Sequence, residues 1–183
     1  MLYVFDVHRF TECNTTGCYN TGVGGYVLYE NTTGTDNAAV GRRALFANTT
    51  ASYNTAIGQE SLKANTTGAK NTATGYEVLK SNTTGTLNTG SGMRALATNT
   101  TGSLNTASGM YALCSNTTAC NNTAIGACSL YANTTGTANV AVGKDALVAN
   151  TIGDDNHHIG MVNMTHICII KFNIKMISRN SKP

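Results

Sequence analysis

Leucine, asparagine and glycine recur along this chain with a period of 17 residues. Counted from its first asparagine, the unit reads N-T-A-[IV]-G-x-x-A-L-x-[AS]-N-T-T-G-x-x, and eight complete units run from Asn20 to Asp155. Unit positions 1 and 12 are always Asn, position 5 is always Gly, position 9 always Leu and position 13 always Thr. Positions 6, 7, 10, 16 and 17 vary and hold every charge of the repeat except Glu30. We therefore expect the constant positions to line an interior or a corner and the variable positions to face water.

The period predicts an all-β fold, a parallel β-solenoid or β-roll of 17-residue coils. An invariant Asn and usually two glycines per unit disfavour a long helix, because each helical Gly costs about 1 kcal/mol. One short strand is predicted at Asn54–Gly58 and its equivalents, and a second around Ala95 and Leu96. The Asn-Thr-Thr-Gly stretch is typical of a turn. An alternative interpretation makes unit positions 5 to 11 a single helical turn.

Stacked coils place each residue on its own copy one coil away. The leucines are then expected to form one apolar column and the asparagines to form amide ladders between coils. The leucine column would contain Leu28, Leu45, Leu62, Leu79, Leu96, Leu113, Leu130 and Leu147. The position-1 asparagine ladder would contain Asn20, Asn37, Asn54, Asn71, Asn88, Asn105, Asn122 and Asn139. With strands about 4.8 Å apart, eight coils would make a rod roughly 38 Å long.

Three segments are expected. Residues 1–19 form an irregular N-terminal piece with a partial repeat, residues 20–160 form the solenoid, and residues 161–183 form an amphipathic strand or tail. Such a strand would cap the open end of the sheet; alternatively, the repeat array has lost its coding frame there. No run of about 18 apolar residues predicts a membrane-spanning helix, and Asp6, His8 and Arg9 interrupt what a signal peptide would need to keep apolar.

The charge pattern argues against nucleic acid as a partner, and without a long apolar run we expect no membrane insertion either. Charged residues make up 11% of the chain, and seven basic and seven acidic residues balance one another between Asn20 and Asp155. The net charge of +3 comes from the tail, where the basic side chains are spread out. Phosphate backbones are normally bound by clustered positive charge.

The pentapeptides Asn54–Gly58, Asn122–Gly126 and Asn139–Gly143 resemble the S-V-A-I-G core of trimeric autotransporter adhesin heads. The full unit, with Ala-Leu and Asn-Thr-Thr-Gly, also resembles repeats of bacteriophage-type tail fibres. The resemblance covers about residues 14–160 and implies a left-handed parallel β-roll, assembled as a trimer, that binds host surfaces. This unit is longer than the adhesin-head repeat, and the chain lacks the stalk, anchor and trimerisation chaperone of those families.

Catalytic and metal chemistry find little support in the sequence. No Ser-His or Cys-His pair recurs with the repeat, so we expect neither an enzyme nor a cofactor. The only weak metal candidates are His157, His158 and His166, near the C-terminal end. The six cysteines lack zinc-type spacing and those of the repeat are expected to face outward; a local Cys13–Cys18 disulfide is the alternative.

Adjacent threonines at positions 13 and 14 are the sharpest functional clue. Hydrogen bonding at a corner explains their constancy best; a trimer contact and an ice-binding face are the alternatives. That face would comprise Thr32, Thr49, Thr66, Thr83, Thr100, Thr117 and Thr134. The sequons beginning at the position-12 asparagines are better explained by turns and ladders than by glycans, since copies about 5 Å apart could not all carry one.

Taken together, these patterns predict a structural and adhesive surface fibre, located outside the cell, on its surface or on a virion. We expect a parallel homotrimer with a host receptor or glycan as partner. The small residue at position 3, Ala or Gly until His158, is expected because neighbouring chains pack closely there. The alternative is an ice-binding solenoid with threonine ladders, or a monomer whose coil is simply narrow.

Overall fold

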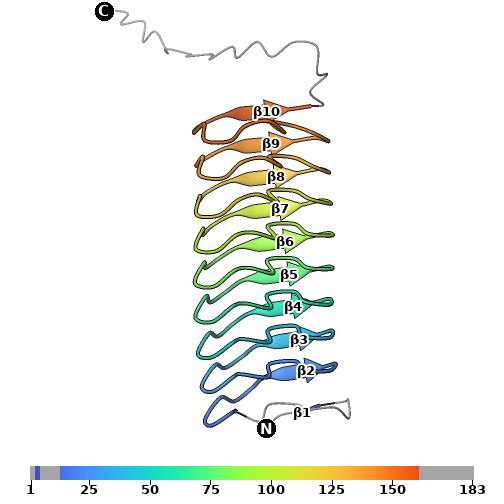
Figure 1. Ribbon diagram of the computed structural model, residues 1–183, viewed down its shortest axis with the longest axis vertical. Coiled ribbons are helices and arrows are strands. Elements are labelled where there is room, and N and C mark those ends of the chain that lie inside the picture. The colour runs from blue at the N-terminus through green and yellow to red at the C-terminus, as the bar shows by residue number, and fades with distance from the viewer. Residues whose placement is uncertain (1–2, 5–12, 161–183) are drawn as a thin grey trace, which may run out of the picture.

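The chain winds into a straight stack of coils in the computed structural model, which describes residues 3–4 and 13–160 (Figure 1). Ten short strands form one parallel sheet, and each strand pairs with those immediately before and after it in sequence. Equivalent residues of the repeat pair without slippage, as Ala39 with Ala56 and Ala56 with Ala73. The parallel β-solenoid with coils of about 17 residues is therefore confirmed.

Each strand from β2 to β10 occupies unit positions 2 to 4, one strand per coil. The strands are β1 (Tyr3–Val4), β2 (Thr21–Val23), β3 (Ala38–Val40), β4 (Thr55–Ile57), β5 (Thr72–Thr74), β6 (Thr89–Ser91), β7 (Thr106–Ser108), β8 (Thr123–Ile125), β9 (Val140–Val142) and β10 (His157–Ile159). The N-terminal piece contributes β1, which pairs with β2 through Tyr3 and Thr21. The strand expected within residues 161–183 lies outside the described residues.

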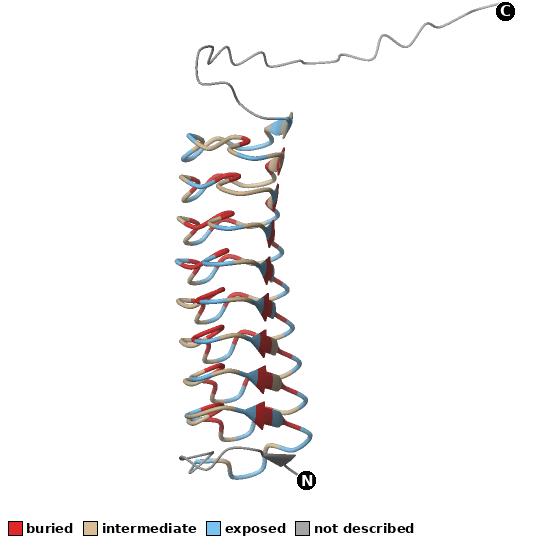
Figure 2. Ribbon diagram, turned by 90° about the vertical axis from the view of Figure 1, so that its right-hand side faces the viewer, coloured by how far each residue is buried: buried red, intermediate tan, exposed pale blue. Residues whose placement is uncertain are grey.

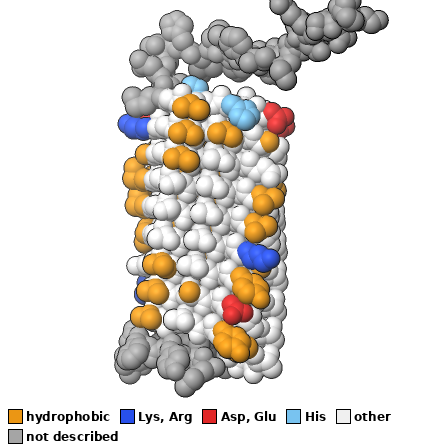
Figure 3. All heavy atoms as spheres, turned by 180° about the vertical axis from the view of Figure 1, so that it is seen from behind, with side chains coloured by type: hydrophobic (Ala, Val, Ile, Leu, Met, Phe, Trp, Pro, Cys, Tyr) orange, Lys and Arg blue, Asp and Glu red, His pale blue; other side chains and the backbone are white. Residues whose placement is uncertain are grey.

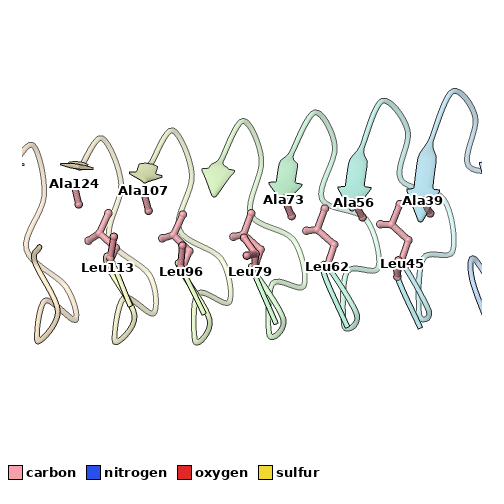
Figure 4. Close-up of a cluster of buried hydrophobic side chains, with 14 of the residues drawn as sticks. Ala39, Leu45, Ala56, Leu62, Ala73, Leu79, Leu96, Ala107, Leu113 and Ala124 are labelled. Atoms are coloured by element: carbon pink, nitrogen blue, oxygen red, sulfur yellow. The ribbon is translucent and has the colours of Figure 1, made fainter. Parts of the chain in front are cut away.

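The core is a single narrow column between the sheet and the opposite wall of the coil. The middle residue of each strand points inward, and Ala39, Ala56 and Ala73 are fully buried. The position-9 leucines reach toward these alanines from the other side (Figure 4). Figure 2 shows buried residues both in the strands and in the opposite wall of the coils. Leu28 through Leu130 are fully buried, and Leu147 in the last complete coil is partly buried. The leucine column predicted from the repeat is confirmed.

The second strand predicted around Ala95 and Leu96 does not form. Positions 6 to 11 of each coil are a run of turns, and no helix replaces the strand among the described residues. Leu96 has a φ of 53°, in the left-handed region. Its equivalents in the other coils have φ values between 49° and 50°, for example 50° in Leu45 and 49° in Leu62. The prediction of a second strand was therefore wrong. A strand needs negative φ, whereas the turn that closes the coil gives the leucine a left-handed backbone.

Two more columns share the left-handed backbone, at positions 7 and 17, as in Arg94 and Lys70. Position 5 has a positive φ as well, between 110° in Gly92 and 136° in Gly109. A side chain at Gly92 would also meet the backbone of Gly109 one coil away. Only glycine adopts this conformation readily beside a stacked neighbour, which explains why position 5 never varies.

Candidate functional site

Two asparagine ladders hold the coils in register. The side-chain amide of Asn99 donates to Asn82 Oδ1 in the previous coil at 2.8 Å and to the Gly102 carbonyl at 2.9 Å. In the position-1 ladder, Asn88 Nδ2 donates to the same Gly102 carbonyl at 2.8 Å. The shared position-15 carbonyl links the two ladders in every complete coil except that of Asn54, whose amide donates to Asn37 Oδ1 instead. The sequence pattern alone did not predict this connection.

The first threonine of each pair belongs to a corner and not to a free hydroxyl face. Thr66 Oγ1 donates to the Thr83 carbonyl of the next coil at 3.1 Å, and the backbone amides of residues 66–68 donate to the same oxygen. Equivalent hydroxyl bonds run from Thr32 through Thr134. Corner bonding is therefore confirmed for position 13. Position 14, as at Thr67, is exposed, and this network does not explain its constancy.

The sequons of the position-12 column have a structural role. Asn48, Asn65 and Asn82 are fully buried within the amide ladder. A glycan cannot attach to an amide that is enclosed between two coils, so the interpretation as turns and ladders is confirmed for these residues.

The outer face of the sheet carries no charge. Its two columns, unit positions 2 and 4, hold Thr, Ser, Val, Ile and Ala from β2 to β9. Val23, Val40 and Ile57 leave an apolar patch at one end and Ile125 another toward the opposite end (Figure 3). Thr74, Ser91 and Ser108 make the middle of position 4 polar. We call these two columns the sheet face.

A column of mixed character borders the sheet face at position 17. Exposed apolar side chains there are Tyr19, Tyr53, Leu87 and Leu104. The same column contains the charged residues Asp36, Lys70 and Asp155. Figure 3 shows this column along one margin of the face. The sheet face and position 17 together make a partly apolar surface three residue columns wide, of which only position 17 carries charges.

A network of ion pairs occupies the turn side of the rod, away from the sheet. Glu60 lies 3.3 Å from Lys63 and 2.9 Å from Lys80, measured from its carboxylate oxygens to each Nζ. Glu77 lies 2.7 Å from Lys80 Nζ and 3.1 Å from Arg94 Nε. Arg43 Nη1 is 3.7 Å from Glu60. We call these six residues the cationic stripe, because four cations share two carboxylates.

The two glutamates contradict the expectation that position 7 faces water. Glu60 and Glu77 are each only 8% exposed. Stacking places them one coil apart, which brings two like charges together, and Lys80 lies against both. The sequence does indicate these ion pairs when the same unit position is compared in successive coils. Arg, Glu, Glu and Arg follow one another at position 7, beside Lys and Lys at position 10.

The titration behaviour of the stripe follows from this geometry. The hydrogen bond from Lys80 lowers the pKa of Glu60 and of Glu77 below its usual value of 4.5, against an opposing effect of burial. In turn, the hydrogen bonds to Glu77 and Glu60 raise the pKa of Lys80 above its usual value. All three groups are therefore held in their charged forms.

Aromatic rings lie at both ends of the stripe. Phe46 and Tyr29 stack with their ring centroids 5.3 Å apart and their planes 9° from parallel. The Arg43 guanidinium carbon lies 5.9 Å from the Phe46 ring and 6.0 Å from the Tyr26 ring. At the other end, the Arg94 guanidinium carbon lies 5.8 Å from the Tyr111 ring. These contacts hold both arginines against the surface.

A shallow, open hollow of about 340 Å³ lies beside the paired lysines. It is lined by Phe46, Ala47, Lys63, Ala64, Lys80 and Ser81, which are positions 10 and 11 of three successive coils. An aromatic ring and two ammonium groups thus meet at one depression. The repeat pattern does not predict this hollow, because Phe46, Lys63 and Lys80 come from position 10, which varies between units.

The remaining sequence candidates do not gather into a site. His157 and His158 lie in β10, where His158 takes the inward position that alanine or glycine holds in other coils; His166 lies outside the described residues. Among the described residues, no group of three potential metal ligands comes together, and no helix has the length and hydropathy to cross a bilayer.

The cysteines differ partly from expectation. Cys13 and Cys18 are exposed and free, so the alternative of a disulfide between them is not formed. Cys114 is also free but buried, which corrects the prediction that it faces outward. Burial raises the pKa of its thiol. Position 10 lies at the edge of the packed interior, where a small apolar side chain is covered by its neighbours.

The structure removes one argument for a trimer. Position 3 points into the core of its own coil, where Ala107 and Ala124 are fully buried opposite the leucine column. It is therefore small because the coil is narrow, as the monomer alternative held. Any neighbouring chain would have to pack on an outward column instead.

Comparison of the chain with protein-family models, curated proteins and solved structures finds no match.

Proposed function

We propose that the chain is a structural and adhesive rod, a left-handed β-roll that acts outside the cell or on a virion and presents side-chain columns to a host surface. The observation that supports this most strongly is that each coil combines constant structural positions with variable ones. Leucine, asparagine, threonine and glycine columns maintain the stack, whereas the columns at positions 6, 7, 10, 16 and 17, most of whose side chains reach the surface, vary without disturbing it. A surface that varies on a constant frame is suited to binding.

The rod would assemble as a parallel homotrimer through the sheet face. Parallel packing about an axis along the rod brings the same coil of each chain to the same height. Ile57 would then contact Ile57 of the neighbouring chains, and Ser91 would contact Ser91. Apolar residues would therefore face apolar residues, and polar residues would face polar ones. The absence of charge from β2 to β9 on this face leaves no like-charge repulsion to oppose such packing.

Adhesion is tested by coating latex beads with the full chain and measuring their detachment under flow from films of matrix proteins, polysaccharides and lipids. The control is the Leu96→Asp chain, which differs at one residue but places an unpaired charge in the core. We expect the native coat to hold beads on at least one film and the control coat to release them. Equal release from every film would contradict an adhesive role.

Ice binding by the sheet face is a second candidate. The position-13 hydroxyls considered first are used within the corner. However, β5, β6 and β7 present outward hydroxyls two residues apart, from Thr72 with Thr74 and from the equivalent Thr and Ser pairs. Such an array is regular in both directions, at about 4.8 Å between strands and about 7 Å along them. Ice shaping at micromolar protein would favour this candidate, and no activity at millimolar would eliminate it.

A further inference from the structure

The charges of the rod are segregated around its circumference, although the repeat body is neutral in total. Six of its seven basic residues lie at positions 6, 7 and 10, on the turn side. Three of its seven acidic residues, Asp36, Asp154 and Asp155, lie at positions 16 and 17 with only Lys70 as a basic neighbour in those columns. The turn side also holds Glu30, Glu60, Glu77 and Asp145, so it keeps a surplus of two positive charges, which the neutral total conceals.

The cationic stripe has a surplus of charge that its own carboxylates do not neutralise. Arg43, Lys63, Lys80 and Arg94 contribute four positive charges against the two of Glu60 and Glu77. The glutamate side chains are 11% exposed, whereas those of the four cations are 30 to 45% exposed. The negative charge therefore lies beneath the surface and the positive charge at it.

The cations follow the rod axis in two neighbouring columns. Arg43 and Arg94 occupy position 7, and Lys63 and Lys80 occupy position 10, in four successive coils that stack about 4.8 Å apart. Phe46 occupies position 10 in the coil before Lys63 and shares the wall of the hollow with it. An aromatic ring face accepts the C–H groups of a sugar ring, and ammonium and guanidinium groups bind carboxylate and sulfate.

We propose that the cationic stripe binds a linear acidic polysaccharide laid along the rod axis, with the cations meeting its anionic groups and Phe46 contacting a sugar ring. This inference rests on the proposed adhesive function and names its ligand class. Nucleic acid fits less well, because a surplus of two charges is small for a phosphate backbone.

The test measures binding of the full chain to immobilised alginate, heparin and neutral dextran oligosaccharides, which separate carboxylate, sulfate and uncharged sugars. We expect binding to one or both acidic sugars and none to dextran. The Lys63→Gln/Lys80→Gln chain should bind about tenfold more weakly, as two exposed ion pairs predict. The Lys70→Gln/Lys144→Gln chain loses the same charge away from the stripe and should bind as the native chain does.

Two further variants separate this proposal from a general effect on folding. Glu60→Gln/Glu77→Gln removes the buried carboxylates and should tighten binding to the acidic sugar, which a merely damaged rod would not do. Phe46→Ala should weaken sugar binding, whereas Tyr131→Ala, at the same unit position beyond the stripe, should not. Unchanged affinity in Lys63→Gln/Lys80→Gln, or equally tight binding of single-stranded DNA, would overturn the proposal. Beads that adhere while no acidic sugar binds would refute this ligand and leave the adhesive function standing.

Discussion

The buried leucine column, with its left-handed backbone, permits two linked predictions, one for substitution by alanine and one for substitution by glycine. Leu96 is fully buried and has a φ of 53°. Leu96→Ala removes three carbon groups at about 0.8 kcal/mol each and leaves a cavity, so we expect a loss of about 3 kcal/mol. The left-handed backbone costs alanine as much as leucine, so this difference reports the side chain alone. At Leu147, which is partly buried, the same substitution should cost about half as much.

The stability lost when alanine is replaced by glycine should then differ between two neighbouring core positions. Ala95 is fully buried and, unlike Leu96, does not have a positive φ. Ala95→Gly should cost about 1–2 kcal/mol through the lost methyl and the added freedom of the unfolded chain. At residue 96, glycine relieves a left-handed conformation that costs other residues about 1–2 kcal/mol. Leu96→Gly should therefore be nearly as stable as Leu96→Ala.

Urea unfolding followed by far-UV circular dichroism measures all five chains. We expect the replacement of alanine by glycine to cost at least about 1 kcal/mol less at residue 96 than at residue 95. Equal steps at the two positions would refute the left-handed backbone of the leucine column. A loss below about 1 kcal/mol in Leu96→Ala would refute its burial.

Three other predictions follow from single features. Asn99→Asp replaces a buried amide donor by a carboxylate facing Asn82 Oδ1 and the Gly102 carbonyl, and should cost more than about 3 kcal/mol; Asn150→Asp, at a partly buried end of the same ladder, should cost clearly less in the same urea assay. Because the folded pKa values of Glu60 and Glu77 are lowered, their stabilisation is present above the ordinary value of 4.5 and is lost as pH falls through the folded values. Thermal unfolding between pH 7 and pH 2 should show that loss in the native chain and less of it in Glu60→Gln/Glu77→Gln; identical profiles would contradict the ion-pair network. Finally, the buried Cys114 thiol, whose pKa is raised, should react with iodoacetamide far more slowly at pH 8 than the exposed Cys18, and comparable rates by peptide mass spectrometry would contradict its burial.

The repeat predicted those features that depend on a residue and its own copy. Leu96, Asn99 and Thr100 each stack on an identical neighbour, so their constancy along the chain indicated the column, the ladder and the corner. The backbone conformation of the coil was harder to predict from the sequence. Propensity suggested a strand at Ala95 and Leu96, and nothing in those side chains indicates a left-handed leucine.

Features that depend on differences between units were predicted least well. Glu60 is buried only because cations from its own and neighbouring coils surround it. A single unit presents Glu60 as a surface charge, and three coils must be read together to find its partners. The same is true of the hollow beside Phe46, whose walls come from three coils, and of Cys114, whose burial depends on what lies above and below.

The measurement that tests the proposed assembly most directly is the mass of the purified chain in solution by light scattering. One chain has a mass of 19.1 kDa, and the account predicts a particle of three chain masses that persists on dilution. The Ile57→Glu/Ile125→Glu chain, with charge placed in both apolar patches of the sheet face, should fall to one chain mass while keeping its circular dichroism. A well-folded native monomer at every concentration would contradict the trimeric adhesive rod.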